Sequence, residues 1–230
     1  MYAYRRYLHA PYGEREIHVL PQVVDPTRHA IDIGVFEGMY SRRLAELCRG
    51  VFGFEANPAS AAFCRAALGR SATIHNCALS DAPGTVILRM PALDSSITGS
   101  ALATIAPSNR LGGGASTQVE VPAARLDDFD LPAVGFVKID VEGHEEAVLR
   151  GAQETLRRDR PTLMVEIEER HNPGAVGRVF EQLQDQDYAV KCLLDGELRD
   201  APPVASLIAR QPGEPDYINN FFFIPRQQTN

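Results

Sequence analysis

Residues 30–41 read AIDIGVFEGMYS, and residues 51–58 read VFGFEANP. The first stretch predicts a short apolar strand, a turn that contains glycine, and the start of a helix. Glycine lets a ligand approach the backbone because it has no Cβ, and the free N–H groups of a helix start carry partial positive charge. The second stretch predicts another strand that ends at Glu55, where a carboxylate can bind ribose hydroxyls. Together the two stretches predict a nucleoside-binding crevice.

The residues of the first turn favour one kind of nucleoside ligand. Dinucleotide sites usually carry G-x-G-x-x-G, whose glycines crowd a pyrophosphate. This chain has Asp32, Gly34 and Gly38 in the spacing D-x-G-x-x-x-G. An acid on the strand would repel a pyrophosphate and suits a cationic ligand with an amino group, such as S-adenosylmethionine. Asp32 could hold that ammonium, directly or through water, or it could orient the backbone of the turn.

The composition limits the class of protein. A chain of 230 residues can form one α/β domain with a sizeable core. Its 23 basic and 30 acidic residues give a net charge of −7, which disfavours a nucleic-acid partner. No apolar run reaches the length of a membrane span, and the amino terminus lacks the apolar segment of a secretory signal. Four cysteines without C-x-x-C spacing are typical of buried thiols in a reducing compartment. We therefore expect a cytoplasmic protein.

Strands alternate with helices from about residue 29 onward. Core strands are predicted to end at Asp32 and Glu55 and to span residues 73–79, 136–141 and 163–168. Helices are predicted over residues 41–49, 58–68, 145–157 and 175–184. This order predicts a mostly parallel sheet with helices on both faces. Residues 85–90 and 119–126 alternate like paired antiparallel strands, while residues 188–194 and 218–224 predict an antiparallel hairpin at the edge of the sheet.

Two segments fall outside this alternation. Residues 1–28 are interpreted as an amino-terminal extension, which contains four of the seven tyrosines. It could cap a pocket, contact another subunit of a homo-oligomer, or pack as a surface arm. Within the domain of residues 29–230, residues 94–118 are rich in small residues and predict a mobile lid or a passive insertion.

The most specific segment is VKIDVEGHEEAVLRG, at residues 137–151. It places two acids, a glycine and a histidine at the carboxyl end of a central strand, where open α/β sheets bind ligands. Four further motifs accompany it in order: DIG at 32–34, FEANP at 54–58, NCALSD at 76–81 and LMVEI at 163–167, with the pair Ser95 and Ser96 between them. With these motifs, residues 30–225 resemble the FkbM family of S-adenosylmethionine-dependent methyltransferases. One departure is Val35-Phe36-Glu37, where many relatives carry an Asn-rich turn.

The resemblance implies a Rossmann-like class I methyltransferase fold, which is α/β with a mostly parallel sheet and an antiparallel last strand. It also implies O-methylation of a hydroxyl on a sugar or small-molecule secondary metabolite, as in natural product biosynthesis. The cofactor would be S-adenosyl-L-methionine. The expected cofactor-binding residues are Asp32, Gly34, Gly38, Glu55, Ala56, Asn57, Cys77, Ala78 and Asp140. Among them Glu55 can accept charge-assisted hydrogen bonds from both ribose hydroxyls, and the resemblance places Cys77 and Ala78 beside the adenine.

The candidate catalytic residues are His144, Asp140 and Glu142. An aliphatic alcohol must lose its proton, and a general base can supply about 10²–10⁴-fold of the rate. His144 is predicted at a helix start, where the helix dipole should keep its ring neutral, although it could simply cap that helix. Asp140 could be a base, a substrate clamp or a metal ligand, and Glu142 could cap the loop. Glu166 could converge with Asp140 on one Mg²⁺ ion, so metal dependence stays open.

Two other functions stay open at this level. One is a non-catalytic protein of the same fold that binds S-adenosylmethionine or acts as a scaffold. The acids at positions 32, 55, 140 and 142 argue against it, because a decayed site need not retain them. The other is an NAD-dependent oxidoreductase, which would bind NADH in place of S-adenosylmethionine.

Overall fold

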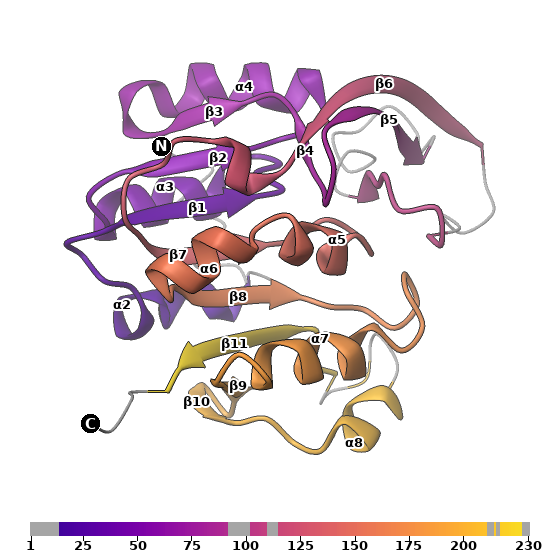
Figure 1. Ribbon diagram of the computed structural model, residues 1–230. Helices are drawn as coiled ribbons and strands as arrows, with labels where there is room; N and C mark the ends of the chain where they lie inside the picture. Colours follow the sequence, from indigo (N-terminus) through magenta and orange to yellow (C-terminus); the bar gives the residue numbers. More distant parts are fainter. Residues whose placement is uncertain (1–13, 92–101, 110–114, 211–213, 215–216, 227–230) are drawn as a thin grey trace.

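The computed structural model describes residues 14–91, 102–109, 115–210, 214 and 217–226. An eight-stranded sheet forms its centre, in the order β10-β9-β11-β8-β7-β1-β2-β3 (Figure 1). These strands are β1 (His29–Ile33), β2 (Val51–Phe54), β3 (Thr73–His75), β7 (Val134–Ile139), β8 (Thr162–Glu166), β9 (Tyr188–Leu194), β10 (Glu197–Asp200) and β11 (Asn220–Pro225). Strands β3, β2, β1, β7 and β8 are parallel, and β11 runs antiparallel to both of its neighbours. The predicted fold class is confirmed.

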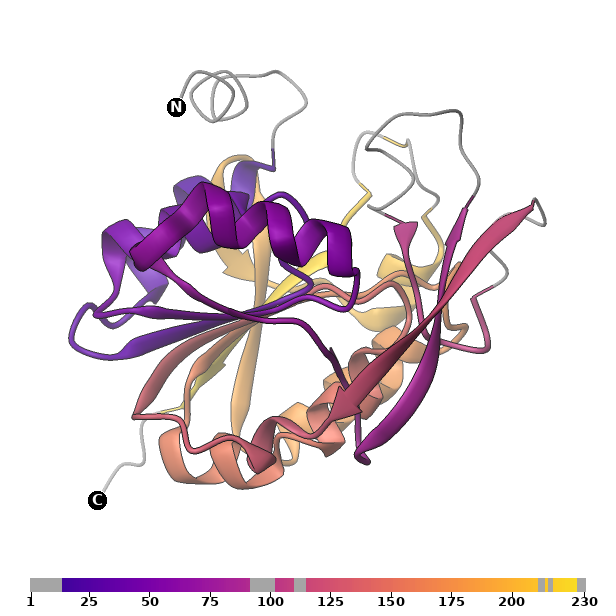
Figure 2. The same ribbon diagram turned by 90° about the horizontal axis from the view of Figure 1, so that it is seen from above.

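Helices cover both faces of the sheet (Figure 2). One face carries η1 (Arg15–His18), α2 (Leu20–Val23), α3 (Met39–Leu47) and α4 (Pro58–Leu68). The other face carries α5 (Glu145–Arg150), α6 (Gln153–Asp159) and α7 (Ala175–Gln184), with α8 (Val204–Ile208) beside α7. Each face buries a separate apolar cluster because successive side chains of a strand point to opposite sides. Phe222 packs in the first cluster, while Phe221 and Phe223 pack in the second.

A smaller sheet stands at the carboxyl end of the central strands. It consists of β4 (Ala78–Leu79), β5 (Gly84–Pro91) and β6 (Ser116–Ala124), in the order β4-β6-β5. The long pair β5 and β6 is antiparallel, which confirms the pairing predicted from their alternation. Leu88 and Val121 form part of the apolar cluster between these strands. Short 3-10 turns, η2 (Gly69–Ser71) and η5 (Leu126–Asp128), complete the described elements.

Two predicted elements are each divided in the structure. Residues 73–79 were expected to form one strand, but the chain leaves the central sheet after β3 and joins the small sheet at β4. Asn76 stabilises the chain where it leaves the central sheet, because its Nδ2 donates to the carbonyls of Glu55 and Ala56 at 2.8 and 3.1 Å. The helix expected over residues 145–157 is divided at Gly151, where a Cβ would lie 2.0 Å from the Ser80 carbonyl oxygen.

The late strands β9 and β11 pair antiparallel, as predicted, but they do not form the edge of the sheet. β11 lies between β8 and β9, so β10 forms the edge of the sheet in its place. The physical reason is the apolar run of residues 221–223, whose three phenylalanine side chains are fully buried and need a sheet interior.

The amino-terminal segment is described from residue 14. Ile17, Val19 and Leu20 are buried in the same cluster as α3, so residues 14–28 pack as part of the domain. Residues 1–13, with the four tyrosines proposed to cap a pocket or contact a second subunit, lie outside the described residues. Of the expected lid, residues 94–101 and 110–114 also lie outside them.

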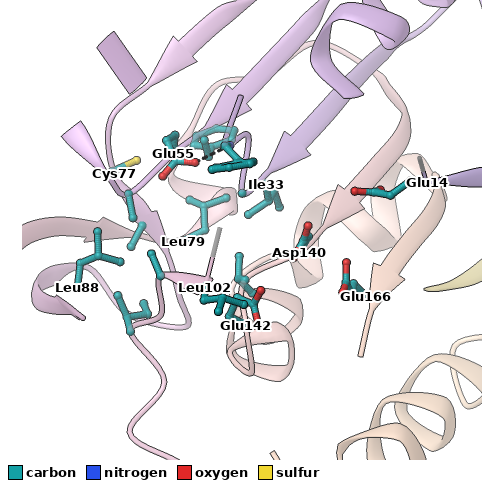
Figure 3. A pocket seen from close by; sticks show the side chains of 18 of the residues that line it. Glu14, Ile33, Glu55, Cys77, Leu79, Leu88, Leu102, Asp140, Glu142 and Glu166 are labelled. Atoms are coloured by element: carbon teal, nitrogen blue, oxygen red, sulfur yellow. Dashed lines mark hydrogen bonds between the residues drawn. The ribbon is translucent and has the colours of Figure 1, made fainter. Parts of the chain in front are cut away.

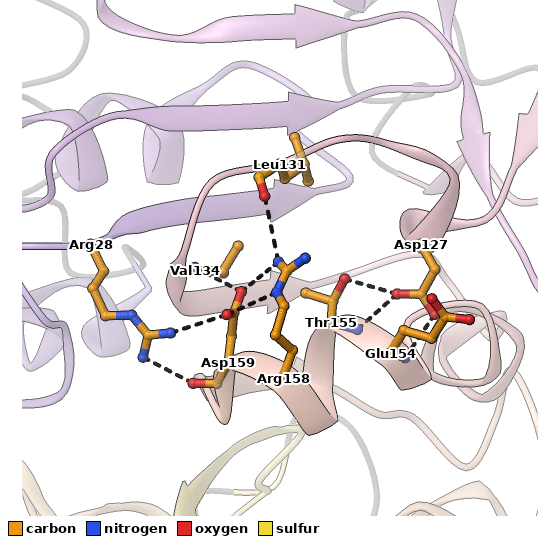
Figure 4. Close-up of polar contacts among 8 residues, drawn as sticks. All are labelled: Arg28, Asp127, Leu131, Val134, Glu154, Thr155, Arg158 and Asp159. Atoms are coloured by element: carbon orange, nitrogen blue, oxygen red, sulfur yellow. Dashed lines mark hydrogen bonds and ion pairs between the residues drawn. The ribbon is translucent and has the colours of Figure 1, made fainter.

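Asp159, the last residue of α6, ties that helix to the amino-terminal ends of the strands (Figure 4). Its Oδ2 accepts hydrogen bonds from the Val134 N–H at 2.9 Å and from Arg158 at 2.7 Å, and Arg28 lies 3.5 Å from Oδ1. Burial alone would raise the pKa of Asp159, but the bonds from Arg158 and Val134 outweigh it and lower that pKa. The carboxylate therefore stabilises the fold in its ionised form.

Replacing Asp159 with alanine should lower the free energy of unfolding by about 2–3 kcal/mol at pH 7, because a buried N–H loses its acceptor. The pKa is lower in the folded protein than in the unfolded chain. This contribution is therefore complete above the unfolded pKa of about 4 and is lost as pH falls through the folded pKa. Urea titrations at several pH values would measure it. As a control, Asp200→Ala removes an exposed ion pair with Lys191 and should leave the stability nearly unchanged; equal losses for the two variants would contradict the assignment.

Candidate functional site

A cavity of about 360 Å³ lies at the carboxyl ends of β1, β2, β7 and β8 (Figure 3). The small sheet closes one side of it through Leu88, and the described part of the expected lid adds Leu102, Ala103 and Ile105. The predicted site residues that line it are Gly34, Glu55, Ala56, Cys77, Ala78, Asp140, Glu142 and Glu166. Asp32, Gly38, Asn57 and His144 are not among its lining residues.

The turn after β1 depends on glycine for two reasons. Gly34 and Gly38 have φ values of +82° and +80°, which favour glycine. A Cβ on Gly34 would also lie 1.8 Å from the backbone oxygen of Asp140, so this glycine lets the ends of β1 and β7 meet. Gly38 precedes α3 and donates its N–H to the Val35 carbonyl at 2.8 Å.

Asp32 lies behind the cavity wall. Its side chain is fully buried, and Ser41 of α3 donates to its Oδ2 at 2.6 Å. Burial raises the pKa of Asp32, while Lys138 and Ser41 oppose that shift. The contact with Ser41 connects β1 to the first turn of α3, which fits the interpretation that Asp32 orients the turn.

Glu55 extends from the end of β2 into the cavity, and its carboxylate is held by the backbone on both sides. The Phe36 N–H donates to Oε2 at 2.8 Å, and the Asn57 N–H donates to Oε1 at 2.7 Å. Burial raises the pKa of Glu55, and these two donors oppose the rise. A carboxylate has about four acceptor positions, so each oxygen can still accept a hydrogen bond from a ligand.

The wall next to Glu55 is apolar. Cys77, Ala78 and Leu79 approach from the segment that connects the two sheets, and Leu88 faces them from β5 (Figure 3). Asn57 is not part of this wall. Its Oδ1 accepts a hydrogen bond from the Ala59 N–H at 3.0 Å and caps α4. A flat ring system could pack against these side chains, beside the carboxylate of Glu55.

The opposite part of the cavity is acidic, with Asp140, Glu166 and Glu14 (Figure 3). Lys138 donates to Asp140 Oδ2 at 2.9 Å. Burial alone would lower the pKa of Lys138, but Asp140 and Asp32 outweigh it and raise that pKa, so Lys138 stays cationic. Burial also raises the pKa of Glu166 well above its usual range, and Asp140 adds to the shift. Asn219 donates to Glu166 Oε1 at 2.7 Å.

The Mg²⁺ site considered for Asp140 and Glu166 gains no support from this geometry. Within the described ranges, no group of three or more His, Cys, Asp or Glu residues is placed to hold a metal ion. The ammonium of Lys138 already contacts Asp140 and supplies positive charge at that carboxylate.

Glu142 joins three parts of the site. Its φ of +53° is unusual for a residue with a side chain. Its carbonyl accepts hydrogen bonds from Thr104 at 2.8 Å and Asn109 at 2.9 Å, so the described part of the expected lid is fastened to the loop after β7. Its Oε2 lies 2.8 Å from Nδ1 of His171. Burial raises the pKa of Glu142, and the bond with His171 opposes the rise.

His144 precedes α5 and is not among the residues that line the cavity. Its Nε2 lies 2.9 Å from Ser80 Oγ, at the end of β4. Burial lowers the pKa of His144, which favours the neutral ring; the prediction had assigned this effect to the helix start. The contact connects the small sheet to α5, the helix after β7.

Sequence reasoning missed several lining residues. Glu14 reaches the cavity from the amino-terminal segment, and no motif around it predicts that position. Arg170 follows β8 by four residues, and the rule that ligands bind at the carboxyl ends of strands could have found it. Phe36 was noted only as a departure from an Asn-rich turn, but its N–H fixes Glu55.

Residues 32–190 match the sequence model of the methyltransferase FkbM domain. The chain belongs to the FkbM methyltransferase family. Residues 32–34, 54–58 and 137–151 lie within this match, and each stretch contributes residues to the lining of the cavity described above. No curated protein sequence matches the chain. Within the described residues, no helix has the length and apolar character that crossing a bilayer requires.

Solved structures share the fold of this FkbM-family chain. A methyltransferase FkbM from Methylobacillus flagellatus KT matches with a TM-score of 0.56 and 14% identity, over 86% of this chain and 44% of that chain. An rRNA methylase from Streptococcus thermophilus matches with a TM-score of 0.51 and 12% identity, over 93% of this chain and 96% of the other. An O-methyltransferase from Bacillus cereus in complex with SAH matches with a TM-score of 0.50 and 11% identity, over 93% and 80%. The chain spans less than half of the Methylobacillus flagellatus protein.

Proposed function

We propose that this chain transfers a methyl group from S-adenosylmethionine to a hydroxyl group of a sugar or another small metabolite. The observation that carries the proposal is the position of Glu55 in a cavity built by the motifs of the FkbM family. Its carboxylate is fixed by two backbone donors, with acceptor positions left for two ribose hydroxyls. The apolar wall of Cys77, Ala78 and Leu88 beside it suits an adenine ring.

The other residues of the cavity also fit this cofactor. The volume of about 360 Å³ lies in the range of small-molecule sites. Asp140 would stabilise the positive charge of the methionine end, while no cationic side chain besides Arg170 is among the described lining residues. When bound, S-adenosylmethionine would supply an electrophilic methyl group at this acidic end.

Within this proposal the chain must hold an acceptor hydroxyl and take up its proton. A general base works best when its pKa lies near the working pH. Glu166 is the candidate, because it lies at the end of β8 in the cavity wall, and burial and the neighbouring Asp140 raise its pKa above the usual range of a glutamate. Asp140, paired with Lys138, would orient the acceptor beside it. We therefore place the base at Glu166 in preference to His144.

His144→Ala should leave the methyl-transfer kcat within about threefold of the parent, because the ring is not part of the cavity lining. The loss of its contact with Ser80 should cost about 1 kcal/mol of stability. Steady-state kinetics with one acceptor and a thermal melt would measure the two effects. A hundredfold loss of kcat with an unchanged melting temperature would indicate that His144, and not Glu166, is the general base.

The proposal is tested by ligand binding first and by product formation second. Calorimetry with S-adenosylhomocysteine and, separately, with NADH distinguishes a methyltransferase from an NAD-dependent oxidoreductase. Methyl-labelled S-adenosylmethionine is then incubated with a panel of neutral, cationic and phosphorylated sugars, and labelled products are identified by mass spectrometry. Tight cofactor binding without transfer to any acceptor would favour the non-catalytic alternative, and binding of NADH alone would overturn the proposal.

A further inference from the structure

A second cavity adjoins the one described above. Its volume is about 430 Å³, and it lies between residues 14–16, the end of β9 and the start of β11. Glu14 and Glu166 line both cavities, so they form the wall between them. In Figure 3 both carboxylates lie at the acidic end of the first cavity, away from Glu55. A ligand in the second cavity would therefore approach the methionine end of the cofactor and not its ribose.

Asn220 brings a buried hydrogen-bond acceptor without a partner, among the described residues, to the wall of this second cavity. The residue is 6% exposed, and it lies opposite Glu166 in the pairing of β11 with β8. Its Nδ2 donates to Asn219 Oδ1 at 3.3 Å, which fixes the orientation of the amide. Its Oδ1 is buried and has no hydrogen-bond partner in the part of the chain that the structure describes. A buried acceptor without a partner costs about 1–3 kcal/mol, and a donor on a ligand would remove that cost.

The charges of the second cavity select between classes of ligand. Its wall contains the acids Glu14, Glu16, Glu166 and Asp195, against the single cation Arg15. Burial raises the pKa of Glu16 and of Glu166, as expected for acids crowded together at a partly desolvated surface. A phosphate or carboxylate on a ligand would be repelled here. Hydroxyl and ammonium groups donate hydrogen bonds. They therefore suit both the acids and the Asn220 Oδ1 atom, which has no partner among the described residues.

We propose that this second cavity binds the methyl acceptor, and that the acceptor is a neutral or cationic polyhydroxylated compound without phosphate or carboxylate groups. The proposal rests on the methyltransferase function stated above, because Glu166 then faces the cofactor on one side and the acceptor hydroxyl on the other. Asn220 anchors a donor group of the acceptor, and Glu16 sets its charge preference.

The test uses three sugars of similar size as probes on the full chain saturated with S-adenosylhomocysteine. They are methyl α-glucopyranoside, glucosamine and glucose 6-phosphate. Ligand-observed NMR titration should show that the first two bind at least tenfold more tightly than the phosphate. Asn220→Leu, which keeps the side-chain volume, should weaken the first two about fivefold or more, the effect of losing one hydrogen bond of about 1 kcal/mol.

Charge reversal gives a variant that does not disturb the sheet. Glu16→Arg should bring glucose 6-phosphate to at least the affinity of the neutral probe. Glu181→Arg, on the exposed side of α7 and outside both cavities, should leave the order of the probes unchanged. Circular dichroism and a thermal melt of each variant verify that it is folded.

Each outcome bears on the acceptor site. Tightest binding by the phosphate in the parent protein, no binding by any probe, or equal effects of Glu16→Arg and Glu181→Arg would overturn the proposal. Failure of the proposed function itself would appear separately, as absence of S-adenosylhomocysteine binding in the same samples. Loss of probe binding with intact cofactor binding therefore counts against the second cavity alone.

Discussion

Glu55→Ala should lower the affinity for S-adenosylhomocysteine by about ten- to hundredfold, or about 1.5–3 kcal/mol. Two charge-assisted hydrogen bonds to the ribose would be lost. The substitution also leaves the N–H groups of Phe36 and Asn57 without their acceptor, so the turn before α3 loses its fixed position. Isothermal titration calorimetry measures the change directly.

Two further variants separate these contributions. Glu55→Gln keeps one side-chain oxygen and should fall between the parent and Glu55→Ala. Glu37→Ala removes a neighbouring acid that is exposed and outside the cavity, and it should change the affinity less than about twofold. Unchanged affinity in Glu55→Ala would remove this residue from the cofactor site, and with it the main support for the proposed cofactor.

Glu166→Gln should lower kcat for methyl transfer by about 10²–10⁴, with S-adenosylhomocysteine affinity changed by less than about threefold. The amide keeps the size of the side chain and can still bond to Asn219, but it cannot accept a proton. Because the pKa of Glu166 is raised, its active, ionised form appears only as pH rises through that value. Parent activity should therefore rise with pH above the usual range of a glutamate, near 4.3.

The pH profile is the decisive measurement for Glu166. The rising limb should be absent in Glu166→Gln, whose residual activity should depend little on pH in the same range. Asp140→Asn serves as the comparison: it should weaken acceptor binding and raise KM, while the limb that belongs to Glu166 remains. Parent-like kcat in Glu166→Gln would assign the proton acceptor to another residue.

Local sequence patterns were sufficient for most of the central sheet and for bringing Gly34 and Glu55 to one cavity. The alternation of apolar strands with helices predicted α4 and α7 with their observed bounds, and the spacing from Gly34 to Glu55 placed both at one edge of the sheet. These predictions succeeded because they depend on short-range physics. A buried strand must be apolar, a close backbone contact needs glycine, and the carboxyl ends of neighbouring parallel strands always meet.

The second cavity, which we propose as the acceptor site, depends on contacts between segments far apart in the chain. The sequence determined that β11 is apolar, but only the tertiary structure inserted it between β8 and β9, and so placed Asn220 opposite Glu166. Likewise, His144 has the chemistry of a base, yet in the structure its ring contacts Ser80 and is not among the residues that line the cavity. Strand order and the direction of a side chain at a helix start are decided by how whole layers pack against one another, and this packing leaves no local pattern in the sequence.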